Sequence, residues 1–259
     1  MNSNIHLNME RILSIPFFAQ LLSEKFSSPM DTLLNSPPGQ SLTPEGWSNA
    51  LALYDGREDY VVTEVEHYKE RSFKDVHHEF LWIRVRHREQ PTNDPYPLIR
   101  VERTIRNNTV MSRLGLWGPA SDSLTILARN TPPPSNTVRL RGITWQLDQA
   151  PSLRHISTLI LDINRSMPDY HLLKASCYTF ARGITEAIDR YTNGVVSQRQ
   201  TPFLFRKSLF LGCVPTPTSR AHDVAQRAVQ RLTDHLEGLL PRLVSHLSSA
   251  NHYDSPPQL

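Results

Sequence analysis

Residues 76–87, VHHEFLWIRVRH, predict the central strand of a β-sheet. Apolar and polar side chains alternate along this stretch, a pattern typical of half-buried strands. The neighbouring segments follow the same pattern, with DYVVTEVEHY at 59–68 and LIRVERTI at 98–105. A polar connection interrupted by prolines joins the second and third segments, so the three successive strands predict an antiparallel meander.

Two further strands and then several helices are expected in the rest of the chain. SDSLTILA at 121–128 and TVRLRGITW at 137–145 predict the strands. Apolar residues recur at helical spacing in three later segments, residues 151–167, Cys177 to about Tyr191, and 219–249. Pro241 is expected to kink or split the last helix. We therefore expect an α+β fold, with an antiparallel β-sheet packed against helices.

Changes in composition divide the chain into four parts. Residues 1–48 predict an N-terminal helix followed by an arm rich in Pro and Ser, and residues 49–218 predict the α+β domain. An amphipathic helix is expected at 219–249 and a disordered tail at 250–259. Because the polar face of the helix carries mixed charges, it favours contact with a partner or a second copy over a membrane surface.

The overall composition indicates a soluble, cytoplasmic protein. The 259 residues carry a formal net charge of +3, and no apolar run reaches the roughly 18 to 20 residues that span a bilayer. Two cysteines cannot form a disulfide framework, and the spacing of Cys and His matches no zinc site. Glycine-rich nucleotide-binding motifs are absent. We expect no metal and no cofactor.

Arginines on the predicted strands raise the alternative of nucleic-acid binding. They are Arg84, Arg86, Arg88, Arg100, Arg103 and Arg106. Glutamates lie between them in the sequence, which favours a solvated, charge-balanced sheet face over a surface that follows a phosphate backbone. We expect no strong interaction with nucleic acid.

The predicted helix that begins at Cys177 raises the question whether this cysteine is a nucleophile. Cys177 lies in its first turn, where the helix dipole favours thiolate over thiol. A nucleophilic cysteine needs a nearby base, and His77 and His78 begin the predicted central strand. Since neighbouring residues of a strand point to opposite faces, only one of the two can face a site. Taken alone, Cys177 on a stripe with Phe180, Ala181 and Ile184 favours a buried core thiol, and Cys213 is expected to be a packed thiol as well.

The order of these motifs resembles the circularly permuted papain-like thiol enzymes, the lecithin:retinol acyltransferase-like superfamily. The resemblance rests on HHEFLWIRV, then LIRVERTI, then ASCYTFARGI, and it covers roughly residues 58–192. Ser176 stands where the family motif usually has asparagine. Uncharacterised fungal proteins with a His-Glu-Phe strand and a Cys-x-x-Phe-Ala helix start are similar as well.

The resemblance implies a cysteine-dependent hydrolase or acyltransferase that acts on an amide, ester or isopeptide through a thioester. Cys177 would be the nucleophile and His78 the base, with the backbone N–H of Cys177 as an oxyanion donor. For the group that orients the imidazole, symmetric strand pairing favours Asn107, and an asymmetric loop favours Glu102. The family's second histidine has no counterpart between residues 88 and 154. The alternative is an inactive papain-like fold that serves as a protein-interaction module.

Overall fold

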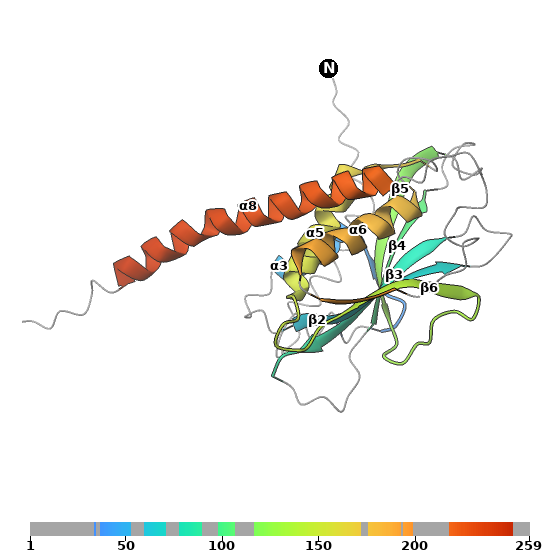
Figure 1. Ribbon diagram of the computed structural model, residues 1–259, viewed down its shortest axis with the longest axis horizontal. Helices are drawn as coiled ribbons and strands as arrows, with labels where there is room; N and C mark the ends of the chain where they lie inside the picture. Colours follow the sequence, from blue (N-terminus) through green and yellow to red (C-terminus); the bar gives the residue numbers. More distant parts are fainter. Residues whose placement is uncertain are drawn as a thin grey trace, which may run out of the picture.

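An antiparallel β-sheet with helices on one face makes up the part of the chain described in the computed structural model (Figure 1). The described residues are 34, 37–52, 60–70, 78–89, 98–106, 117–171, 176–192, 194–198 and 218–250. All the strand pairs formed by the described residues are antiparallel, and the α+β class with an antiparallel sheet is confirmed.

The strands predicted from alternating side chains are neighbours in the sheet. In chain order the strands are β1 (Ser41–Leu42), β2 (Tyr60–Glu70), β3 (Glu79–His87), β4 (Leu98–Ile105), β5 (Trp117–Leu127), β6 (Thr137–Thr144), β7 (Asp169–His171) and β8 (Val195–Gln198). They lie side by side in the order β1-β5-β4-β3-β2-β6-β8, while β7 pairs with β5. The consecutive strands β2 to β5 therefore form a meander, with β3 near its centre.

The alternation along β3 separates two apolar clusters. Its odd-numbered residues between 81 and 85 join the main core, which the helices share. Phe80 and Trp82 point to the other face, where they pack with Tyr68 and Leu98. Because the side chains of a strand alternate between the two faces, one short sequence contributes to both clusters.

Four helices lie among the described residues. They are α3 (Pro44–Ala52), α5 (Leu153–Ser166), α6 (Cys177–Tyr191) and α8 (Thr218–Ala250). The first turns of α8 pack on α5 and α6, and its C-terminal part extends away from the sheet (Figure 1). Contrary to the expected split, α8 continues through Pro241. One proline removes a single backbone hydrogen bond, and here that loss does not end the helix.

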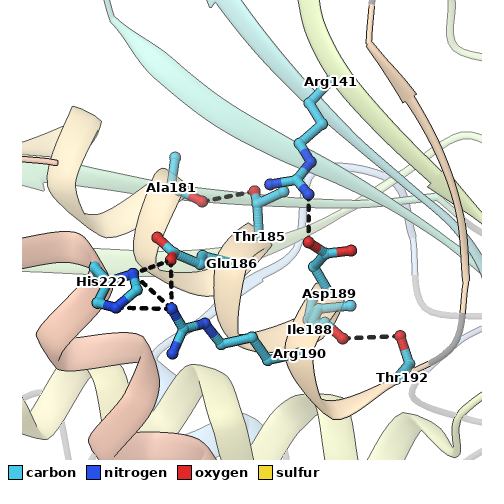
Figure 2. Close-up of polar contacts among 9 residues, drawn as sticks. All are labelled: Arg141, Ala181, Thr185, Glu186, Ile188, Asp189, Arg190, Thr192 and His222. Carbon is cyan, nitrogen blue, oxygen red and sulfur yellow. Dashed lines mark hydrogen bonds and ion pairs between the residues drawn. The ribbon is translucent and has the colours of Figure 1, made fainter.

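Ionic contacts hold α6 between the sheet and α8. Figure 2 shows Asp189 of α6 paired with Arg141 of β6 on one side. On the other side, the Oε1 atom of Glu186 contacts the Nδ1 atom of His222 from α8 at 2.6 Å, and Arg190 joins the same group (Figure 2). These contacts hold α6 in place between the sheet and α8, and Cys177 is the first residue of this helix.

The first described segment differs from the loose arm expected there. Residues 41 and 42 pair with β5, and Trp47 of α3 is 1% exposed and donates from Nε1 to Ser157 Oγ at 3.0 Å. Burial of the Trp47 indole against α5 holds this segment in a defined structure, although its Ser, Pro and Gly content is typical of a loop. The expected N-terminal helix and residues 251–259 lie outside the described residues. Within the part of the chain that is described, no helix is long and apolar enough to cross a membrane.

Candidate active site

Cys177 is the first residue of α6. The helix starts there because an extended Ser176 precedes it, and Phe180, Ile184 and Ile188 then face the core at helical spacing. Serine at this position commonly accepts a hydrogen bond from the first turn. Here the Ser176 side chain makes no capping bond, and its Oγ has no hydrogen-bond partner among the described residues. The Ser176 side chain therefore does not occupy the N–H groups of the first turn.

His78 lies immediately before β3. Its carbonyl oxygen accepts a hydrogen bond from the Glu70 N–H at 2.9 Å, which continues the pairing of β2 and β3. Its imidazole stacks on Phe80 with the ring centroids 6.1 Å apart. These two contacts fix the backbone and the ring plane of His78.

The carboxylate of Glu102 binds this imidazole. Glu102 Oε2 lies 3.0 Å from His78 Nε2 and 2.9 Å from Arg100 Nη2. Burial alone would raise the pKa of Glu102, but the hydrogen bond from His78 and the charge of Arg100 hold it below its ordinary value. An ionised Glu102 fixes Nε2 as the protonated nitrogen and leaves Nδ1 for a second partner.

The thiol of Cys177 is the second partner of His78. Burial lowers the pKa of His78, but hydrogen bonds with Cys177 and Glu102 and their negative charges raise it to about 10. Both neighbours therefore favour the protonated imidazole of His78. Cys177 is 2% exposed, whereas the side chain of His78 is 19% exposed, so solvent meets the pair mainly at the imidazole.

Tyr170 approaches Cys177 from β7. Its hydroxyl group is hydrogen-bonded both to the side chain and to the backbone N–H of Cys177. Burial, followed by the charge of Cys177, raises the pKa of Tyr170, so the phenol keeps its proton. β7 is held by pairing with β5, in which Tyr170 lies opposite Gly118. A phenol O–H and a backbone N–H thus lie together beside the sulfur.

The register between β3 and β4 explains why Glu102 is the group that contacts the imidazole of His78. A symmetric pairing of 77–86 with 97–106 would place residue 105 opposite His78. The structure instead pairs Phe80 with Glu102 and Arg84 with Leu98, a shift of one residue. This shift puts Glu102 on the face of Phe80, where it meets His78.

Three of the residues selected from the sequence, Cys177, His78 and Glu102, therefore lie in contact. Asn107, His77 and Cys213 fall outside the described residues. The contact of Tyr170 with Cys177 was not predicted from the sequence, although the position of Tyr170 shortly before Cys177 was a usable signal. Within the described part of the chain, no cluster of three or more His, Cys, Asp or Glu residues fits a metal ion.

Comparisons with protein-family models, with curated proteins and with solved structures find no match to this chain. The function is therefore inferred from the geometry around Cys177.

Proposed function

We propose that this protein is a cysteine-dependent hydrolase or acyltransferase with a permuted papain-like site. The observation that carries the proposal is the chain of contacts from Cys177 to His78 to Glu102. The three side chains come from the start of a helix, the start of a strand and a neighbouring strand. A nucleophile, a base and a group that orients the base are the parts that thiol catalysis needs.

In the proposed reaction the Cys177 thiolate attacks the carbonyl carbon of an ester, amide or isopeptide. The carbonyl electrons move to oxygen, and the resulting oxyanion takes hydrogen bonds from the backbone N–H of Cys177 and the hydroxyl of Tyr170. The imidazolium of His78 then protonates the leaving group as the carbon–heteroatom bond breaks, which leaves a thioester on Cys177. His78, now neutral, removes a proton from water or another acceptor, and that nucleophile displaces the thiolate.

A panel of ester, amide and isopeptide substrates tests this proposal directly. We expect at least one class to be turned over, with an acyl adduct on the peptide that contains Cys177 in mass spectra of acid-quenched reactions. Release of product with water as the only acceptor identifies a hydrolase, and a requirement for a second nucleophile identifies an acyltransferase. Turnover without any adduct on Cys177 under single-turnover conditions would contradict the thioester route.

A protein-interaction module without catalytic activity is the second candidate, and the burial of Cys177 favours it. At 2% exposure the residue resembles a core thiol more than an open nucleophile. Such a module predicts a folded protein whose Cys177 does not react with thiol-directed probes. Fast reaction at neutral pH excludes this candidate.

Tyr170→Phe is expected to lower kcat by about 10²- to 10³-fold, because it removes one donor to the oxyanion. KM should change little, since the lost interaction forms mainly in the transition state. Steady-state kinetics and the rate of iodoacetamide alkylation of Cys177 provide the check. If alkylation falls as much as kcat, Tyr170 serves the resting arrangement of Cys177 and not the oxyanion.

Glu102→Gln is expected to move the alkaline limb of the pH profile of kcat/KM downward by about one unit. The charge and hydrogen bond of Glu102 raise the pKa of His78, so their loss lowers it and deprotonates the general acid at lower pH. In the wild type this limb should lie near pH 10. Glu64→Gln is the matched control, because Glu64 pairs with Arg84 instead of His78. An unshifted limb in Glu102→Gln would contradict the assigned role.

A further inference from the structure

A second set of charged residues lies close to the start of α6, and the proposed reaction does not use it. It consists of His67 and Lys69 from β2, Glu79 from β3 and Arg182 from α6, and we call it the Lys69 cluster. Lys69 and Glu79 are directly opposite each other in the β2–β3 pairing. His67 and Lys69 are each 3% exposed, and Glu79 is 0% exposed.

Glu79 holds the cluster together. Its Oε2 atom lies 2.7 Å from His67 Nε2 and 3.6 Å from Arg182 Nε. Its Oε1 atom has no hydrogen-bond partner within the described residues. Burial acts to raise the pKa of Glu79, but the surrounding basic groups, His67 first, hold it below its ordinary value. The carboxylate therefore remains ionised.

The cluster carries more positive than negative charge. The ammonium of Lys69 and the guanidinium of Arg182 face one carboxylate, so the balance is positive whatever the state of His67. The Nζ atom of Lys69 lies 5.2 Å from the centroid of the Tyr178 ring, and Tyr178 directly follows Cys177 in the first turn of α6. The charge of Cys177 also acts on Lys69.

A buried ammonium group costs free energy relative to an apolar side chain of the same volume. Burial, together with the charge of Arg182, holds the pKa of Lys69 below its ordinary value, while the charges of Glu79 and Cys177 act to raise it. Two negative groups therefore oppose the loss of the ammonium form, Glu79 in the cluster and Cys177 in the candidate site. The interaction with Cys177 links the Lys69 cluster to the proposed reaction.

We propose that Lys69 is a positioning residue of the candidate site, whose charge, held by Glu79, stabilises negative charge at Cys177. This inference rests on the proposed cysteine-dependent function. In this proposal the Lys69 ammonium and the N–H groups at the start of α6 act together. Both place positive charge near the Cys177 thiolate and near the oxyanion that forms beside it.

Besides Lys69, three titratable groups interact with Cys177, and the test leaves them unchanged: His78, which precedes β3, Tyr170 of β7 and Tyr178 of α6. Around these groups lie the charges of Glu79 of β3, Arg103 of β4 and Arg182 of α6. Because Lys69 and Glu79 have opposite charges, their neutralisation should have opposite effects on Cys177. A purely structural role predicts no such opposition of sign.

The test measures the pH dependence of iodoacetamide alkylation of the full chain in a Cys213→Ser background, so that Cys177 is the only reactive thiol. Lys69→Met should move the midpoint of the alkylation profile up by about one pH unit, which slows alkylation about tenfold on the rising limb. Lys69→Arg keeps the charge and should restore most of the rate. Glu79→Gln should move the midpoint down.

Arg182→Gln provides a second variant that is safer for folding, because the Arg182 side chain is 27% exposed. We expect a shift in the same direction as Lys69→Met, but smaller because of solvent screening. Circular dichroism confirms the fold of each variant. Midpoints that stay fixed, or that move the same way in Lys69→Met and Glu79→Gln, overturn the inference and leave the proposed function intact. A folded wild type whose Cys177 resists alkylation at every pH overturns both.

Discussion

Cys177→Ser is expected to abolish turnover and labelling by a thiol-directed activity probe, with kcat/KM lowered by about 10⁴-fold or more. The serine hydroxyl is isosteric with the thiol but does not form an ion pair with an imidazole near neutral pH. The hydrogen bond and the charge of Cys177 are among the causes that raise the pKa of His78, so the variant should also return His78 toward a neutral imidazole at pH 7. NMR titration of His78 provides a second readout.

Cys213→Ser is the matched control for this prediction, because the chain contains only two cysteines. The control should keep both labelling and turnover. Labelling that survives in Cys177→Ser but disappears in Cys213→Ser would assign the reactive thiol to the other cysteine. Equal labelling in both variants would show that the probe does not react selectively with Cys177, and it would contradict a nucleophile at this position.

The local elements of this fold follow from the sequence because their signals are local. Alternation along residues 59–68, 76–87 and 98–105 predicts β2, β3 and β4, since the period of two depends only on neighbouring residues. Helical spacing after Cys177 predicts α6 for the same reason. The contact between Cys177 and His78 was inferred from the order of short motifs, and the structure brings the two side chains together.

Long-range pairing was not predictable in the same way. A one-residue change in the β3–β4 register decides whether Glu102 or a residue near 107 approaches His78, and the loop sequence does not determine that register. Local sequence patterns do not indicate that Lys69 and Glu79 are buried, because their burial depends on how α6 covers the sheet. Such features need the assembled fold.

Arg103 is the clearest departure from the expected solvated arginine face. Its side chain is 0% exposed and forms two hydrogen bonds with Asp122, from Nε at 2.8 Å and from Nη2 at 2.6 Å. Asp122 lies 19 residues later, on β5, and also accepts from Asn164 of α5 at 2.6 Å. The guanidinium packs 4.5 Å from the ring centroid of Phe180 on α6. One ion pair therefore joins two strands and two helices.

Asp122→Ala is expected to destabilise the fold by about 3 to 5 kcal/mol, because it leaves the buried guanidinium of Arg103 without its counter-charge. The change should appear as a lower urea midpoint with little change in the m-value. Since Phe180 lies one turn after Cys177, the fraction that remains folded should also show slower alkylation of Cys177. Chemical denaturation and alkylation kinetics below the unfolding transition measure the two effects separately.

Two controls separate the loss of a buried charge partner from the loss of any ion pair. Glu64→Ala removes the partner of Arg84 in a pair whose side chains are 26% and 33% exposed, and it should cost no more than about 1 kcal/mol. Arg103→Met combined with Asp122→Leu removes both charges at similar volume, so it should recover most of the stability lost in Asp122→Ala. Equal destabilisation by Asp122→Ala and Glu64→Ala would contradict the assignment, because a buried charge is costlier to leave without its partner than an exposed one.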